Sequence, residues 1–355
     1  MEWHLILDKL KLLVSLLVMP VAGIAQHNTH WQLIDSGTRA SFRGLSVPSD
    51  SVIWVTGTRG TFVHSFDGGK TWQADSMAGA THLDFRDVHA VDAHTVYMMS
   101  AGPGERSRIY KTTDGGRSWK LQFTMPDSAG FLDGFEFWEG QRGIAFGDPL
   151  EGRLFVITTT DGGNIWLRIP PENIPPVIEG EFAFAASGTS IAVQGKSQVW
   201  IGTGGAAARV FHSNDGGHSW TVANTPLSSG SESAGIFSLA FRDEKNGVAV
   251  GGDYRKPAEA ASHVIVTKDG GQTWEIPKSA QLEFRSGVVF IPQMHGQILI
   301  AVGTSGADSS GDGGLTWKRI DAGGFNVVSA GSSRASVWAA GPEGKIARLI
   351  VPTSR

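Results

Sequence analysis

The chain has 355 residues, with 30 Lys and Arg, 34 Asp and Glu and no Cys, so its net charge is −4 and its pI is near 6.3. An acidic balance argues against general nucleic-acid binding, and the lack of Cys excludes disulfides and thiolate metal sites. The 47 glycines show no collagen-like period, so we interpret them as turn residues of an all-β fold.

Residues 1–25 have the pattern of an export signal. Lys9 and Lys11 precede an apolar run, which ends in the small-x-small cleavage pattern Gly23-Ile24-Ala25. The run is shorter than the roughly 20 residues that span a bilayer. The sequence therefore predicts an exported protein, periplasmic or extracellular, with no membrane span and one mature domain at 26–355. A buried or amphipathic N-terminal segment is the alternative.

An orphan segment follows at Trp31-Gln32-Leu33-Ile34-Asp35. It matches the strand that comes after each copy of the repeat described below, such as Trp317-Lys318-Arg319-Ile320-Asp321. No such strand follows the last repeat unit, which runs into the C-terminus. We therefore predict that the orphan segment completes the last blade of a closed ring and covers its open edge.

Six copies of a short motif built on Asp-Gly-Gly, with Trp three residues after the second Gly, run through the chain. Their aspartates lie 43 to 54 residues apart, a period that indicates a propeller or solenoid. The aspartates are Asp67, Asp114, Asp161, Asp215, Asp269 and Asp312, and the tryptophans are Trp72, Trp119, Trp166, Trp220, Trp274 and Trp317. These are Asp-boxes, also called BNR repeats.

The residue types of the motif suit a tight turn between two strands. An Asp carboxylate accepts local N–H bonds, glycine takes a positive φ without steric cost, and a Trp can pack its indole between neighbouring units. We interpret the Asp-box residues as structural; carbohydrate or calcium binding is the alternative. No EF-hand-like loop supports calcium.

Each unit reads as four short alternating strands. In the second unit these are 85–91, 95–99, 108–112 and 119–123. Gly-rich second strands recur in the other units, including a seventh at Val337–Gly341 with no Asp-box after it. The expected fold is an all-β, seven-bladed propeller of four-stranded blades.

The long loops predict a binding face. Five long connections, at 101–107, 147–152, 170–180, 226–235 and 252–262, open on the face opposite the Asp-box turns. Loops carried by a rigid scaffold commonly carry function. On this face, Arg43, Arg86 and Arg285 follow the Phe that opens their blades, and we expect one cationic cluster at the channel mouth that grips a carboxylate. Arginines paired with local acids are the alternative.

Acidic residues on or near the same face allow a second hypothesis. Glycosidase chemistry needs two carboxylates about 5–10 Å apart. The candidates are Asp133, Asp148, Glu181, Glu232 and Asp253, with Tyr254 as the only plausible sialidase-type nucleophile. Solvated loop charges are the alternative. We assign no catalytic residue, no metal and no cofactor: His-Glu-x-x-His is absent, and no dinucleotide motif stands at Gly202–Gly205.

The blade pattern resembles the photosystem II assembly and stability factor family, Ycf48/Hcf136-like. The features are Phe-Arg at a blade start, a Gly-rich second strand such as Gly247–Gly251, and Asp-Gly-Gly-x-Thr-Trp. The resemblance implies a lumenal or periplasmic scaffold without enzyme activity that binds a protein partner. The alternative is a glycoside hydrolase, sialidase-like or of another Asp-box type, that acts on carbohydrate at the loop face.

Overall fold

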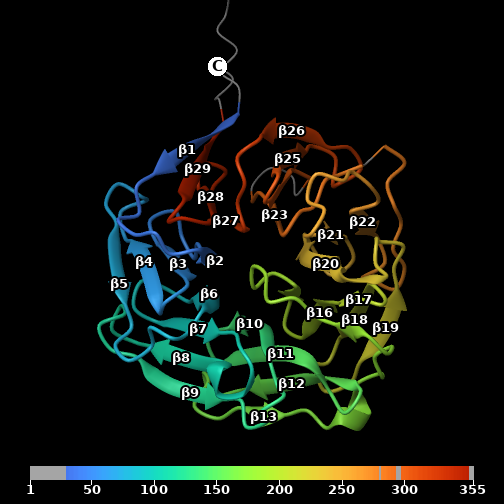
Figure 1. The fold of residues 1–355 in the computed structure, drawn as a ribbon, viewed down its shortest axis with the longest axis horizontal. Coiled ribbons are helices and arrows are strands. Elements are labelled where there is room, and N and C mark those ends of the chain that lie inside the picture. Colours follow the sequence, from blue (N-terminus) through green and yellow to red (C-terminus); the bar gives the residue numbers. More distant parts are fainter. Residues whose placement is uncertain (1–28, 280, 293–296, 352–355) are drawn as a thin grey trace, which may run out of the picture.

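Seven antiparallel sheets form a closed ring of blades in the computed structural model, which describes residues 29–279, 281–292 and 297–351 (Figure 1). The all-β, seven-bladed propeller is confirmed. The predicted export signal at 1–25 lies outside the described residues. Among the described residues, no helix is long and apolar enough to cross a membrane.

The first three blades follow chain order from the inner to the outer strand. They are β2 (Phe42–Ser46), β3 (Ile53–Gly57), β4 (Thr61–Ser65) and β5 (Gln73–Ser76); β6 (Phe85–Ala90), β7 (Val96–Ser100), β8 (Arg108–Thr112) and β9 (Lys120–Thr124); and β10 (Leu132–Glu139), β11 (Arg142–Leu150), β12 (Arg153–Thr159) and β13 (Leu167–Arg168). Two short 3-10 helices lie in connections, at η1 (Gly104–Arg106) and η2 (Pro171–Asn173). The predicted strands of the second blade match these bounds to within one residue.

The remaining blades keep the same order, with one exception. They comprise β15 (Ile191–Gln194), β16 (Gln198–Gly202), β18 (Arg209–Ser213) and β19 (Thr221–Asn224); β20 (Ser231–Phe241), β21 (Gly247–Asp253) and β22 (Val264–Thr267); β23 (Gly287–Phe290), β24 (Leu299–Gly303), β25 (Gly306–Ser310) and β26 (Lys318–Asp321); and β27 (Val327–Ala330), β28 (Val337–Ala340) and β29 (Ile346–Ile350). In the fifth blade the outer strand is reduced to the bridge Val266–Glu275, and β14 (Glu181–Phe182) and β17 (Gly204–Gly205) extend the inner edge.

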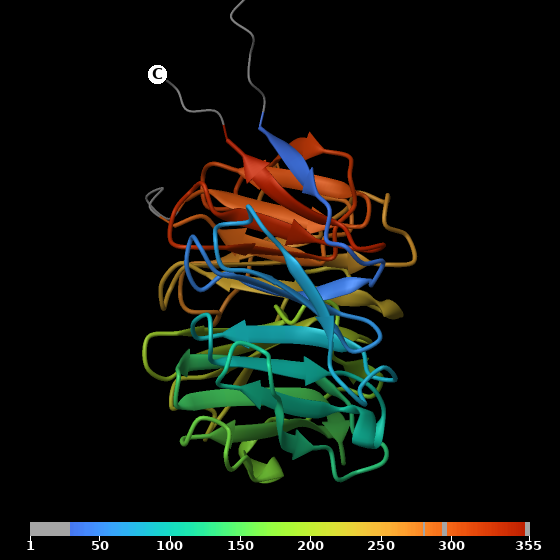
Figure 2. The same cartoon turned by 90° about the vertical axis from the view of Figure 1, so that its left-hand side faces the viewer.

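The N-terminal strand closes the ring, as predicted. Strand β1 (His30–Ile34) pairs antiparallel with β29, with Trp31 opposite Leu349. Trp31 is buried against Phe325, whereas Leu33 on the same strand is 66% exposed. Figure 2 shows β1, in blue, lying against the red strands of the last blade. The last blade therefore combines both ends of the described chain.

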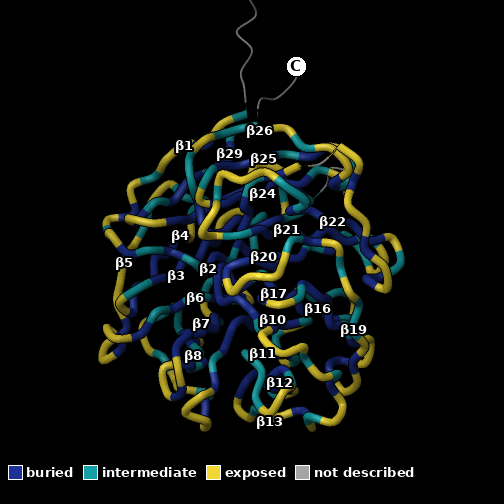
Figure 3. The backbone as a smooth tube through the Cα atoms, turned by 45° about the vertical axis from the view of Figure 1, so that its right-hand side comes forward, coloured by how far each residue is buried: buried dark blue, intermediate teal, exposed yellow. Residues whose placement is uncertain are grey.

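Apolar side chains hold neighbouring blades together. Seven of the eight apolar clusters found in the described residues each join two adjacent blades. The Asp-box tryptophans belong to this packing: Trp72 meets Trp338 of the preceding blade at a ring distance of 5.5 Å, edge to face. Figure 3 shows buried residues in the body of the ring and exposed ones along the outer turns.

One predicted loop is a strand. The stretch 147–152 continues β11 to Leu150 and ends in the two-residue turn Glu151-Gly152, where both residues have positive φ, 56° and 76°. This turn geometry matches the twist of a hairpin and lets the paired strands run on. The prediction of a loop here was wrong, because Asp148 and Pro149 look like turn residues when the pairing partner on β12 is unknown.

Candidate binding pocket at the channel mouth

The Asp-box turns are built from contacts within five residues. In the first box, the Oδ1 atom of Asp67 accepts N–H bonds from Lys70 and Thr71, both at 2.9 Å, and its Oδ2 atom accepts the Thr71 hydroxyl at 2.6 Å. Ser65 Oγ donates to the same carboxylate and accepts the Gly69 N–H at 2.9 Å. Hydrogen bonds from Thr71 lower the pKa of Asp67 to about 2. The carboxylate is thus engaged in the turn.

The second glycine of each box has a packing role as well as a turn role. Gly69 has φ +81°, and a Cβ added there would lie 2.1 Å from the Trp338 ring. A Cβ added at Gly116 or Gly271 would lie 3.1 Å from a Trp ring of the preceding blade. In these three boxes the second glycine therefore packs against an indole of the blade before it.

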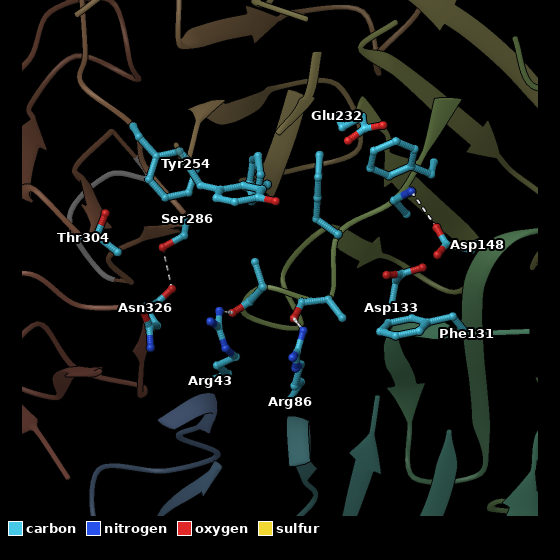
Figure 4. Close-up of a pocket in the computed structure, with 17 residues that line it drawn as sticks. Arg43, Arg86, Phe131, Asp133, Asp148, Glu232, Tyr254, Ser286, Thr304 and Asn326 are labelled. Carbon is cyan, nitrogen blue, oxygen red and sulfur yellow. Dashed lines mark hydrogen bonds between the residues drawn. The ribbon is translucent and has the colours of Figure 1, made fainter. Parts of the chain in front are cut away.

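A pocket of about 420 Å³ opens where the blades converge, and no Asp-box residue lines it. Its lining brings together Arg43, Arg86, Phe131, Asp133, Asp148, residues 182–186, Glu232, Phe237, Tyr254, Phe284, Ser286, Thr304 and Asn326. Figure 4 shows Arg43 and Arg86 side by side on one side of this space, with Asp133 and Asp148 together on another. These residues come from six of the seven blades and from the segment between β14 and β15.

A segment at 183–190, which we call the channel segment, reaches into the centre of the ring (Figure 1). The Ala186 carbonyl accepts Arg43 Nη1 at 3.1 Å, and the Ala185 carbonyl accepts Arg86 Nη1 at 3.3 Å. The Ala183 N–H donates to Asp148 Oδ1 at 3.1 Å. Side chains of the first three blades thus hold its backbone.

Further contacts tie the channel segment to the opposite blades. Ser187 Oγ donates to the Ser286 carbonyl at 2.7 Å, and Thr189 Oγ1 donates to Ser238 Oγ at 2.7 Å. Gly188 lies so close to Asp87 that an added Cβ would be 2.1 Å from its carboxylate. The role of this segment is not predicted from the sequence; its run of small residues, Ala-Ala-Ser-Gly-Thr-Ser, is the available signal.

The structure brings together two of the three predicted arginines. Arg43 and Arg86 line the pocket, and burial, together with the charge of Arg86, lowers the pKa of Arg43. Arg86 Nε is bound to Asp84 Oδ2 at 2.7 Å. Among the described residues, no ion pair joins Arg43 to a carboxylate.

Arg285 does not join them. Its side chain is buried, its Nε donates to Asp308 Oδ2 at 2.7 Å, and its Nη1 donates to Ser305 Oγ at 2.9 Å. Arg285 also precedes its strand, β23, whereas Arg43 and Arg86 lie within theirs. The expected cluster of three is therefore a pair, because a carboxylate from β25 captures the third guanidinium.

The acidic candidates divide in the same way. Asp133, Asp148, Glu232 and Tyr254 line the pocket. Glu181 is buried and forms an ion pair with Arg209, whose Nε donates to both carboxylate oxygens at 3.0 Å. Asp253 accepts the Arg255 N–H at 2.9 Å and does not line the pocket.

Burial controls the two inner carboxyls. Asp133 is 1% exposed, and its Oδ2 atom has no hydrogen-bond partner among the described residues. Burial, then the charge of Asp148, raises its pKa well above the ordinary value. Burial also raises the pKa of Asp148, to about 6, against the opposing effect of the Ala183 N–H. In the described residues, no group of three or more His, Asp or Glu is placed to hold a metal ion.

Aromatic rings form the remaining side, which we call the aromatic wall: Phe184, Phe237, Tyr254 and Phe284. Phe184 stacks on Phe237 with centroids 4.0 Å apart, and Phe237 meets Phe284 edge to face at 4.8 Å. The three Phe residues belong to the eighth apolar cluster, which lies at the channel mouth. Of the wall, only Tyr254 is among the residues singled out from the sequence, because its members lie far apart in the chain. The pocket thus combines a cationic edge, an aromatic wall and two inner carboxyls.

Comparisons with known proteins agree with this architecture. The BNR/Asp-box repeat family matches residues 63–74. Two curated relatives, both named photosystem II assembly lipoprotein Ycf48, come from Synechococcus and Picosynechococcus. The first is 23% identical over 256 residues, 69% of this chain and 66% of that protein; the second is 26% identical over 292 residues, 69% and 76%. The match thus spans just under two thirds of the first relative.

Solved structures show the same fold. YCF48 bound to D1 peptide has a TM-score of 0.62 at 17% identity, covering 91% of this chain and 95% of that one. YCF48 from Cyanidioschyzon merolae also has a TM-score of 0.62, at 16% identity, with coverage of 90% and 98%. The Pan2 WD40 domain of Neurospora crassa reaches 0.64 at 12% identity, covering 92% and 96%. The chain is an Asp-box propeller that resembles Ycf48.

Proposed function

We propose that this chain is an exported, non-catalytic propeller scaffold that binds a segment of a partner protein in the pocket at the channel mouth. The observation that carries the proposal is Arg43: its guanidinium lines an open pocket beside Arg86 and has no carboxylate partner among the described residues. The relatives named lipoproteins support export, to the periplasm or the extracellular side.

An anionic group on the partner would offset the unfavourable free energy of holding the Arg43 charge in a buried position beside Arg86. Burial and the neighbouring Arg86 both disfavour the charged form of Arg43, as its lowered pKa records. Arg43 gives one N–H to the Ala186 carbonyl, which leaves donors for a ligand carboxylate. Paired N–H···O bonds from a guanidinium are the strong, directional way to hold such a group.

The relatives support a protein partner. The propeller of YCF48 bound to D1 peptide has the same fold, and the curated relatives carry the name of an assembly factor. By the same reasoning we propose that the partner segment is peptide rather than sugar or nucleic acid.

The test is peptide selection on residues 26–355 followed by affinity measurements. We expect Arg43→Gln combined with Arg86→Gln to weaken binding of the selected peptides by about tenfold or more, the value of one or two charged hydrogen bonds. Lys70→Gln combined with Arg117→Gln is the matched control, because it also removes two positive charges, from exposed Asp-box turns. Equal affinity for the wild type and the double variant would refute the proposed site.

The hydrolase alternative draws on one observation, that Asp133 and Asp148 share the pocket. A retaining or inverting pair works best when the two environments push the pKa values apart, so that one group is an acid and the other an ionised base. Here burial raises both. Turnover of fluorogenic glycosides by the wild type that is lost in Asp148→Asn would favour the hydrolase.

A further inference from the structure

We propose that the partner segment presents an apolar side chain next to a carboxylate, and that the aromatic wall receives the apolar side chain while Arg43 and Arg86 bind the carboxylate. This inference rests on the proposed function of the pocket and specifies its ligand. Both surfaces line one space of about 420 Å³, which has room for a few side chains.

The aromatic wall is a preformed surface. Phe184, Phe237 and Phe284 are 9%, 3% and 3% exposed and are locked by stacked and edge-to-face contacts. Such rings lose little conformational freedom on binding, so ordering the wall adds little to the cost of complex formation. Full burial of one apolar side chain strengthens binding by about tenfold or more.

Tyr254 is the part of the wall that a ligand reaches first. It is 43% exposed, while its ring meets Phe237 at 6.2 Å and Phe184 at 6.5 Å, both edge to face. No hydrogen bond joins its hydroxyl to another described residue. Figure 4 shows the Tyr254 ring across the pocket from Arg43. A ligand that fills this space therefore contacts both Tyr254 and Arg43.

Carboxylates already present in the pocket limit the ligand to few acids. Asp148 and the exposed Glu232 line the same pocket as the two arginines, whereas burial and the charge of Asp148 raise the pKa of Asp133 well above its ordinary value. A run of ligand carboxylates would place some of them against these groups, and like charges in a confined site cost binding free energy. One acid beside an apolar residue avoids this, whereas a polyacidic tract does not.

The experiment is a peptide array in which a Gly/Ser-flanked central pair takes every combination of the twenty amino acids, probed with folded residues 26–355. We expect the strongest signals from pairs of one apolar or aromatic residue with Asp or Glu, about tenfold above either partner paired with Ser. Acid–acid pairs as the strongest binders would overturn the inference while leaving the proposed function intact. If no array peptide prefers the wild type over the Arg43→Gln, Arg86→Gln variant, both fail.

Variants assign the two preferences to their residues. We expect Tyr254→Ala to reduce the preference for the apolar residue by about threefold to tenfold and leave the preference for the acid, and Arg43→Gln to do the reverse. Phe66→Ala is the matched control, because Phe66 is also 43% exposed but lies in an Asp-box turn. Tyr254→Phe should behave as the wild type. A loss of apolar preference in Phe66→Ala, or none in Tyr254→Ala, would show that the wall does not receive that side chain.

Discussion

Aspartates at the Asp-box face and at the channel mouth have opposite acid–base behaviour. Asp67 and Asp114 have pKa values lowered to about 2, because neighbouring Thr or Ser hydroxyls and backbone N–H groups bond to the ionised form. Asp148 has a pKa raised to about 6, and the pKa of Asp133 is also raised well above its ordinary value, because burial disfavours their charge. Aspartate therefore stabilises a turn as an ionised group at the Asp-box face, whereas at the channel mouth its carboxyl is buried and poorly solvated.

The two regions also differ in the range of their contacts. Asp67 finds its partners within four residues, whereas Arg43 bonds to a carbonyl 143 residues away, and Ser187 to one 99 residues away. Local contacts survive as long as the hairpin does. The pocket exists only while the ring is closed, which leads to three predictions, from the largest expected effect to the smallest.

Opening the ring should have the largest effect. Trp31 packs in the cluster that joins the last two blades, so we expect Trp31→Ala to lower the free energy of unfolding by about 3–5 kcal/mol, as for other buried aromatic truncations. Urea denaturation monitored by fluorescence measures this. Leu33→Ala, at an exposed position of the same strand, should change stability by no more than about 0.5 kcal/mol. Equal effects of the two variants would contradict the role of β1 in closure.

The carboxyl of Asp148 should make stability fall as pH rises. Its pKa is about 6 in the folded protein and near 3.8 in the unfolded chain, so the folded state binds the proton more tightly. Ionisation of Asp148 therefore lowers the free energy of unfolding as the pH rises from about 4 to about 6. Asp148→Asn keeps an acceptor for the Ala183 N–H and removes the charge. We expect the variant to be more stable than the wild type by about 1–2 kcal/mol at pH 7 and equal to it near pH 4. The same difference at both pH values would argue against this assignment.

The carboxylate of Asp67 should have a smaller effect with the opposite sign. Its pKa is lowered, so its contribution is present above about pH 4 and is lost as pH falls toward 2. We expect Asp67→Asn to lower Tm by a few degrees at pH 6, with the difference shrinking at lower pH. Thermal unfolding of the two proteins, followed by circular dichroism at pH 6 and at lower pH, measures this difference in Tm. A difference that grows on acidification would show that the turn does not depend on the ionised carboxylate.

The sequence determined the features whose causes are local. Each Asp-box is a run of eight residues that contains its own donors, acceptors and positive-φ glycines, so the six turns and the strands beside them could be predicted. The closing strand at Trp31 could be predicted because it repeats the pattern of the strand after each box, although its partner β29 lies at the other end of the chain. The position of Arg43 and Arg86 also followed from their shared place at a blade start.

Only the tertiary structure decided what the pocket contains. Arg285 has the same Phe-Arg context as Arg43, yet Asp308 on β25, two strands away in the same blade, pairs with it. Glu181 binds Arg209 and so does not line the pocket. Residues 183–190 lie in the channel because residues tens to hundreds of positions away in the chain form hydrogen bonds with them there. The aromatic wall arose in the same way, from rings on separate segments that the ring of blades brings together. Contacts of this kind depend on where the closed ring places each strand. A sequence pattern predicts contacts between residues that are close in the chain, but not between residues that only the closed ring brings together.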